Sequence, residues 1–135
     1  MRELPDSTRT AVEAAQAVGC QVSQIVKSLI FVLDPPGNPI LVLVSGTNRV
    51  NEKALGSLLT GKLGKANADL VQSATGFVIG GVPPLAHATP LPTYIDEDLL
   101  QYDLLWAAAG TPHAVFPISP QDLLKVTHAI PIKVV

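Results

Sequence analysis

The chain has 135 residues, of which 47% are hydrophobic and 15% charged, and its formal net charge is −2. This composition predicts one compact domain over residues 1–135, and it argues against a disordered chain and against a protein that coats nucleic acid by bulk attraction. A single cysteine, Cys20, excludes an internal disulfide and suits a reducing compartment. We find neither a signal peptide nor an apolar run of membrane-spanning length, so we expect a cytoplasmic protein without a membrane partner.

The first predicted element is a helix over residues 11–18. Thr10 and Glu13 have the spacing of a capping box, in which two side chains satisfy the free amides of a helix start. Gly19 supplies a stop, because glycine readily adopts the left-handed conformation that ends helices. The pattern therefore predicts a short helix of two turns.

Two strands follow and are expected to pair as a hairpin. Residues 24–33, QIVKSLIFVL, and residues 39–45, PILVLVS, are rich in β-branched and aliphatic side chains, and the turn-forming DPPGN lies between them. One residue does not fit a buried strand, because lysine is almost never fully buried without a partner. Lys27 therefore either reaches water at the end of the strand or points into a cleft.

Caps, breakers and β-rich runs predict the remaining elements. In chain order we expect a helix near 51–59, a Gly/Lys loop, a short helix capped by Asn67, strand-like residues 76–81, strands within 92–95, 103–109 and 113–118, a helix opened by Ser119-Pro120 that ends near Val126, and a closing strand within 129–135. Since no regular βαβ alternation is present, the prediction is a mixed α/β domain with a mostly antiparallel, curved or barrel-like sheet and a few flanking helices.

Several familiar catalytic motifs are absent. Residues 56–63 nearly spell a phosphate-binding P-loop, but Leu63 stands where a magnesium-binding hydroxyl is needed. The histidines have no paired ligand spacing, so we expect no metal and no cofactor. Cys20 follows a helix C-terminus, which disfavours a thiolate, and no nucleophile elbow occurs. An enzyme of this sequence would lack its own covalent nucleophile.

Charge is unevenly spread along the chain. Residues 46–65 carry Arg49, Lys53, Lys62 and Lys65 against one acid, whereas residues 96–103 carry four acids and no base. Both segments can be plain solvated faces. Alternatively, the basic segment contacts a polyanion locally and the acidic one does not.

Three features could form a site. Lys27 is the first, the glycine- and proline-rich GGVPPLAH at 80–87 is the second, and AAGTPHAVF at 108–116, which presents His113, is the third. Unshielded glycine amides of the second feature could face a ligand carbonyl or oxyanion. Each feature also has a structural explanation, namely a lysine that snorkels to water, a surface loop and a plain hairpin.

In this order, the segments resemble the YbaK-type family, free-standing relatives of the editing domain inserted in bacterial prolyl-tRNA synthetases. The matching blocks are STRTAVEAAQAVG, QIVKSLIF, LVSGTNRVN, GFVIGGVPPLAH, YIDEDLL and WAAAGTPHAVF. The resemblance implies a deacylase that hydrolyses the ester of a mischarged tRNA, expected to be tRNA(Pro) carrying alanine, 2-aminobutyrate or cysteine. It also implies a chain that is short at its N-terminus relative to its relatives, and prolyl-tRNA synthetase as a further partner.

The resemblance also implies roles for particular residues. Lys27 would meet the phosphate and ribose of the terminal adenosine as a point charge, and the glycine loop would hold the aminoacyl group while a tRNA hydroxyl helps to activate water. The implied catalytic residues are Lys27, Gly80 and Gly81. The implied substrate-binding residues are Ser28, Ser45, Gly46, Val82, Pro83, Pro84, His87, Gly110, Thr111 and His113. The implied tRNA-binding residues are Arg49, Lys53, Lys62 and Lys65.

Two other functions stay open at the level of sequence. The first is a non-catalytic module that binds tRNA or a nucleotide as a synthetase partner, and retention of Lys27 with an open glycine loop argues against it. The second is a hydrolase of small aminoacyl esters, which would not need the basic segment 46–65.

Overall fold

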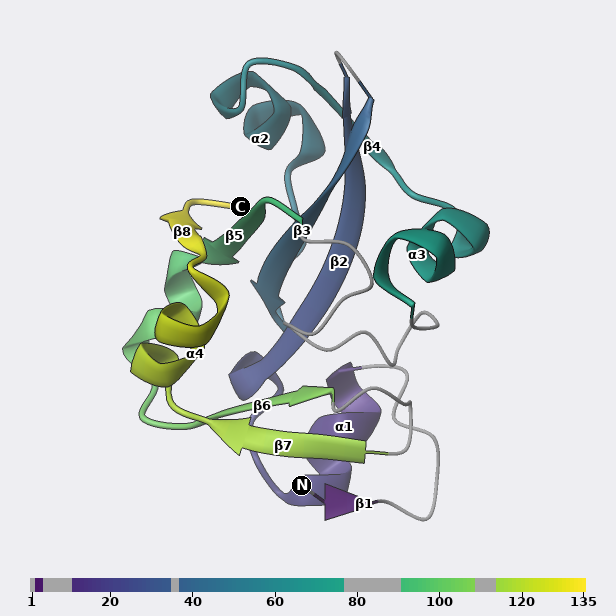
Figure 1. Cartoon of the computed structure of the whole chain (residues 1–135). Helices are drawn as coiled ribbons and strands as arrows, with labels where there is room; N and C mark the ends of the chain where they lie inside the picture. Colours follow the sequence, from purple (N-terminus) through teal and green to yellow (C-terminus); the bar gives the residue numbers. More distant parts are fainter. Residues whose placement is uncertain (1, 4–10, 35–36, 77–90, 109–113) are drawn as a thin grey trace.

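The computed structural model describes residues 2–3, 11–34, 37–76, 91–108 and 114–135 (Figure 1). The strands in these ranges join in one sheet of order β1-β7-β6-β2-β3-β5-β8, and β4 pairs with β2 off this path. The elements in chain order are β1 (Arg2–Glu3), α1 (Ala11–Val18), the 3-10 helix η1 (Val22–Gln24), β2 (Ile25–Asp34), β3 (Asn38–Ser45), α2 (Glu52–Leu58), β4 (Lys62–Lys65), α3 (Ala68–Thr75), β5 (Thr93–Asp96), the 3-10 helix η2 (Glu97–Gln101), β6 (Leu105–Ala108), β7 (Ala114–Ile118), α4 (Pro120–Thr127) and β8 (Ile130–Ile132).

The predicted mixed, mostly antiparallel sheet is confirmed. Four pairings are antiparallel, namely β1 with β7, β2 with β3, β2 with β4, and β6 with β7. Three are parallel, namely β2 with β6, β3 with β5, and β5 with β8. The central β2–β3 hairpin is the one that the sequence predicts, in continuous register from Val26↔Ser45 to Leu33↔Asn38.

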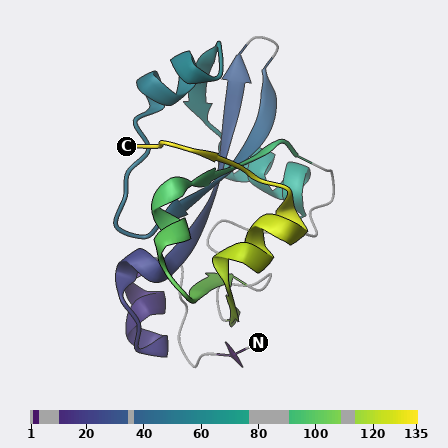
Figure 2. The same cartoon turned by 90° about the vertical axis from the view of Figure 1, so that its left-hand side faces the viewer.

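Both faces of the hairpin are covered, which explains why its strands read as unbroken apolar runs rather than alternating ones. On one face, Val26 and Ile30 pack with Leu41 and Leu43 in a core that α3, η2 and α4 cover. On the other face, Phe31 packs with buried residues of β3, α2 and β4. Figure 2 shows η2 and α4 side by side on their side of the sheet.

The second edge of β2 is only partly paired by the described residues. Parallel β6 pairs with Ile25 and Val26, and antiparallel β4 pairs with Phe31–Asp34. Between them lie residues 27–30, where the described chain provides no strand partner, although the Ala66 amide donates to the Ile30 carbonyl over 3.3 Å. Figure 1 shows β6 and β4 meeting opposite ends of β2, so the sheet divides around the stretch that contains Lys27.

Local signals placed the helices correctly. Asn51, Asn67 and Ser119 each accept a backbone amide of the following turn through the side chain, which makes them the N-caps of α2, α3 and α4. Gly19, which follows α1, has the left-handed φ of +76° expected of a helix stop. Because these contacts lie within a few residues, the sequence alone suffices to predict them.

Two expectations are corrected. The Gly/Lys loop is in fact strand β4, in which Leu63 is the one buried residue between exposed lysines. The polar sequence gives little sign of this strand, because the strand forms by backbone pairing with β2, about thirty residues earlier, and that pairing does not need apolar side chains. The closing strand covers only Ile130–Ile132, and β1, η1 and η2 were not predicted.

The strand expected at 76–81 lies outside the described residues beyond Gly76. None of the described helices has the length and apolarity that crossing a bilayer would require.

Candidate functional site

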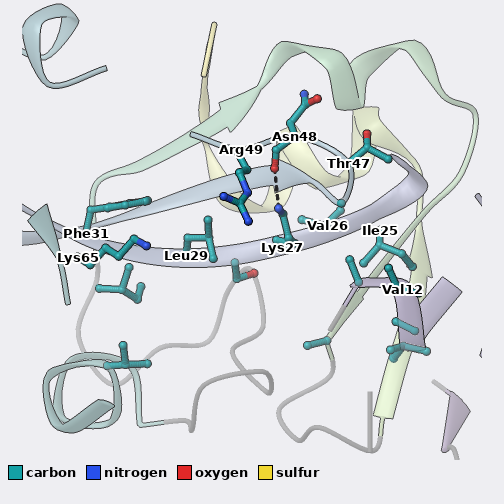
Figure 3. A pocket seen from close by; sticks show the side chains of 18 of the residues that line it. Val12, Ile25, Val26, Lys27, Leu29, Phe31, Thr47, Asn48, Arg49 and Lys65 are labelled. Carbon is teal, nitrogen blue, oxygen red and sulfur yellow. Dashed lines mark hydrogen bonds between the residues drawn. The ribbon is translucent and has the colours of Figure 1, made fainter. Parts of the chain in front are cut away.

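A cavity of about 640 Å³ opens at the partly paired edge of β2, within the size range of small-molecule sites. Its described walls come from α1, β2, the loop after β3, and β4, with single residues of α3, β6 and β7. Among its described lining residues, all ionisable side chains are basic: Lys27, Arg49 and Lys65. Figure 3 shows Arg49 close to Lys27 above the middle of β2, and Lys65 farther along the strand beside Phe31. The cavity therefore favours an anionic ligand.

Lys27 takes the second of the two positions that the sequence leaves open, since it lines the cavity. It stands opposite Val44 and is two residues from Leu29, so its stem leaves β2 on the face that holds Phe31. Its Nζ donates to the Asn48 backbone oxygen over 2.6 Å. Burial lowers the pKa of Lys27 below its ordinary 10.5, the Arg49 guanidinium lowers this pKa further, and the Asp96 carboxylate opposes both.

Ser28, the next residue, leaves β2 on the opposite face, between Val26 and Ile30. Ser28 is also among the residues that line the cavity, but its Oγ is buried and has no hydrogen-bond partner among the described residues. A buried hydroxyl without a partner costs about 1–3 kcal/mol. A polar ligand group that reached it would remove that penalty.

The loop after β3 supplies the wall beside Lys27. The Gly46 amide donates to the Ile25 carbonyl, and the Asn48 amide donates to the Ser45 carbonyl, each over 2.9 Å. Gly46 is required by packing, since a Cβ there would lie 2.2 Å from the Val22 carbonyl oxygen. The loop therefore has little freedom to move away from β2.

Ser45 does not line the cavity but supports it. Its hydroxyl donates to the Ser23 carbonyl over 2.7 Å, and its amide donates to Asp96 Oδ2 over 3.1 Å. The role expected for Ser45, direct substrate binding, remains a prediction, and the contacts present in the structure are internal ones.

The four expected tRNA-binding bases separate into two pairs. Arg49 and Lys65 line the cavity with Lys27, whereas Lys53 and Lys62 line a second hollow between α2 and β4 that also contains Glu52. Lys62 and Lys65 are three residues apart in one strand, so their side chains leave it on opposite faces.

Sequence reasoning missed Asn48 and Asp96 as parts of the site. Asn48 lies in the SGTN turn, and Asp96 was interpreted only as one member of an acidic segment. The carboxylate is 1% exposed and accepts the Ser45 amide and the Asn48 side chain. An acid that follows an apolar strand, as Asp96 follows Tyr94 and Ile95, was the available signal for a buried anchor.

The remaining expected residues lie outside the described ranges, and their roles stay predictions. They are Gly80, Gly81, Val82, Pro83, Pro84, His87, Gly110, Thr111 and His113. Within the described ranges, no three His, Cys, Asp or Glu side chains come together as a metal site would need. Burial raises the pKa of the Cys20 thiol, as expected of an unreactive cysteine.

The chain is similar to known proteins over most of its length. A solved structure described as a candidate trans-editing enzyme for prolyl-tRNA synthetase shares 53% identity, with a TM-score of 0.92 over 98% of this chain and 83% of that one. The uncharacterised protein YwhH of Bacillus subtilis is 27% identical, over 90% of this chain and 76% of its own length. EbsC of Enterococcus faecalis, described as a candidate Cys-tRNA(Pro)/Cys-tRNA(Cys) deacylase, is 24% identical over 88% of this chain and 73% of its own length.

The sequence pattern of aminoacyl-tRNA editing domains matches residues 5–126, nearly the whole chain. The resemblance to the YbaK-type family and the expected hydrolase class are thereby confirmed. The chain belongs to the aminoacyl-tRNA editing domain family and is an aminoacyl-tRNA deacylase by that membership.

Proposed function

We propose that this protein edits in trans by hydrolysing the ester of mischarged tRNA(Pro) that carries a small non-cognate amino acid such as alanine, 2-aminobutyrate or cysteine. The observation that carries the proposal is the cavity at the edge of β2, which gathers Lys27, Arg49 and Lys65 with no carboxylate in its described lining. The solved structure at 53% identity, described as a candidate trans-editing enzyme for prolyl-tRNA synthetase, supports the choice of tRNA.

Lys27 would bind the phosphate at the 3′ end of the tRNA. Its ammonium is a compact point charge with three donors, of which the Asn48 carbonyl occupies one. The other two have no partner among the described residues and could bind phosphate or ribose oxygens. Since burial and Arg49 already disfavour the charged form of Lys27, a phosphate that neutralises both cations would be bound strongly.

Ser28 would contact the aminoacyl end. Its hydroxyl lies on the opposite face of β2 from Lys27, so the two groups can hold the two ends of one ligand that passes the open edge of the strand. Apolar neighbours of Ser28, such as Val26 and Ile30, would surround a small side chain.

In the reaction, water adds to the ester carbonyl carbon, the bond to the ribose oxygen breaks, and that oxygen takes a proton. The products are the free amino acid and tRNA with both terminal hydroxyls restored. An aminoacyl ester is already activated, so positioning and charge stabilisation can supply much of the rate acceleration without a protein nucleophile. This chemistry agrees with the absence of a nucleophile motif in the sequence.

The test is deacylation of a panel of charged tRNAs. We expect hydrolysis of alanyl-, 2-aminobutyryl- or cysteinyl-tRNA(Pro), while prolyl-tRNA(Pro) and correctly charged alanyl-tRNA(Ala) and cysteinyl-tRNA(Cys) are spared. Tight binding of tRNA without hydrolysis of any member would instead identify a non-catalytic module. Equal hydrolysis of aminoacyl esters that lack a tRNA body would identify a small-ester hydrolase. Co-purification with prolyl-tRNA synthetase would test the expected partnership separately.

A further inference from the structure

One residue, Asn48, connects Lys27 to two acidic side chains. Its backbone oxygen accepts from the Lys27 ammonium over 2.6 Å. Its side-chain nitrogen donates to Asp96 Oδ2 and to Asp98 Oδ2, each over 2.8 Å. Figure 3 shows the two ends of Asn48 pointing in different directions, with the backbone oxygen toward Lys27 and the amide away from it.

The orientation of the Asn48 amide follows from its partners. Ionised carboxylates only accept hydrogen bonds, so the nitrogen and not the oxygen of the amide must face Asp96 and Asp98. The amide nitrogen carries two hydrogens, and each carboxylate takes one. An aspartate at this position could not make these bonds and would place a third negative charge beside the two carboxylates.

Asp96 is an unusually well-fixed anchor for this amide. Its carboxylate is 1% exposed, and besides Asn48 it accepts the amides of Ser45 and Asp98 over 3.1 and 3.0 Å. Burying a charge is costly unless hydrogen bonds compensate it, and three donors do so here. The acid belongs to β5, which pairs with β3 in the middle of the sheet, so its position is set by the fold.

From these contacts we infer that Asn48 is the positioning residue for Lys27: the side chain of Asn48, held by Asp96 and Asp98, fixes the backbone oxygen that orients the lysine ammonium in the cavity. The catalytic consequence rests on the proposed function, whereas the effect on the Lys27 side chain does not. The acidic segment is then partly an internal support of the site rather than only a solvated face.

The test separates orientation from charge. Among the described residues, the charged groups near Lys27 or its partner Asn48 come from four elements. They are Arg49 from the loop that holds Asn48, Lys65 from β4, Asp96 from β5 and Asp98 from η2. Asn48→Ala leaves all of them in place and removes only the two side-chain bonds. In ¹⁵N-lysine spectra, with Lys27→Arg used for assignment, we expect the Lys27 ammonium to exchange with water faster in Asn48→Ala than in the wild-type protein.

The kinetic arm is a double-mutant cycle with alanyl-tRNA(Pro). We expect Asn48→Ala to lower kcat/KM about tenfold, which corresponds to the loss of one well-placed hydrogen bond. In the Lys27→Ala background the same substitution should have no further effect, because Asn48 acts only through Lys27. Additive losses, or an unchanged Lys27 signal in Asn48→Ala, would overturn the inference.

Controls keep the outcomes distinct. Ser119→Ala is the matched control, because it also removes a side-chain hydrogen bond to the backbone, at the start of α4 and away from the cavity lining. It should lower Tm without changing kcat/KM or the Lys27 signal. If Asn48→Ala fails to fold, Asp98→Ala removes one of its two acceptors and should give a smaller change of the same kind. If wild-type protein hydrolyses none of the tRNAs, the proposed function fails, while the Lys27 signal still decides whether Asn48 orients the lysine.

Discussion

The four basic residues of segment 46–65 separate into two pairs that have different surroundings in the fold. Arg49 and Lys65 line the cavity that contains Lys27, and no carboxylate is among its described lining residues. Lys53 and Lys62 line the hollow between α2 and β4, where Glu52 supplies a negative charge. The first pair is placed to contact the same ligand as Lys27, and the second pair is not.

The difference shows that a cluster of like charges along the chain need not form one surface. Strand alternation separates Lys62 from Lys65, and helix α2 carries Lys53 away from the loop that holds Arg49. We therefore expect the pair at the cavity to affect the reactive end of the substrate. We expect the pair at the second hollow to affect only the binding of the tRNA body.

The largest effect should come from Lys27→Ala. We expect kcat/KM for mischarged tRNA to fall by about 10- to 100-fold, because a hydrogen bond to a charged group contributes about 1.5–3 kcal/mol and each 1.36 kcal/mol is tenfold in rate. Thermal unfolding should show an unchanged or slightly higher Tm, since the substitution removes a partly buried charge. Lys53→Ala is the matched control. Wild-type turnover in Lys27→Ala would show that the lysine has no part in the reaction.

Charge reversal should distinguish the two pairs. Arg49→Glu with Lys65→Glu is expected to weaken the binding of both whole tRNA and a minimal substrate, 3′-aminoacyl-adenosine 5′-phosphate, whereas Lys53→Glu with Lys62→Glu should weaken the binding of whole tRNA alone. With two to four phosphate contacts in total, log affinity should fall with log salt with a slope of roughly −2 to −4.

Reversal of Lys125 and Lys133, which line neither hollow, is the control and should change neither substrate. Equal losses from the two pairs on both substrates would contradict the division.

The depressed pKa of Lys27 predicts opposite pH dependences for binding and stability. Binding of a non-hydrolysable analogue of 3′-aminoacyl-adenosine 5′-phosphate should weaken as pH rises through the lowered pKa, because the ammonium loses its charge. Between that pKa and 10.5 the unfolded chain holds the proton that the folded chain has lost, so the free energy of unfolding should rise with pH. Subtracting the pH curves measured for Lys27→Met isolates the contribution of Lys27. Parallel pH curves for the wild-type protein and Lys27→Met would rule out a lowered pKa of Lys27.

The smallest effect should come from Ser28→Ala. We expect affinity for the minimal substrate to fall about fivefold, as for one neutral hydrogen bond of about 1 kcal/mol. Stability should be equal or higher, because the buried hydroxyl has no partner among the described residues. Isothermal titration and thermal unfolding measure the two quantities. A loss of stability without loss of affinity would assign Ser28 to the core.

Sequence reasoning placed Lys27 in a strand of the β2–β3 hairpin, and it identified the family that residues 5–126 match. It interpreted β4 as a loop, because KLGK carries only one apolar residue and its pairing with β2 is a long-range event. It assigned Asp96 to a solvated face, because the one local signal, an acid after apolar strand residues, does not identify the distant Ser45 amide and Asn48 side chain as partners of the carboxylate.

The sequence by itself determined the features that depend on a few neighbouring residues. Asn51, Asn67 and Ser119 cap their helices through bonds that span three residues, and the β2–β3 strands pair across a short turn. Tertiary structure alone decided that residues 27–30 of β2 have no strand partner on this edge among the described residues, and that Arg49 and Lys65 line the same cavity as Lys27. It also decided that Asp96 supports Asn48 from a different strand. These features join residues 22 to 81 positions apart. Such contacts form only when the whole sheet is assembled, because the chain entropy lost in closing long loops must be offset by many contacts at once.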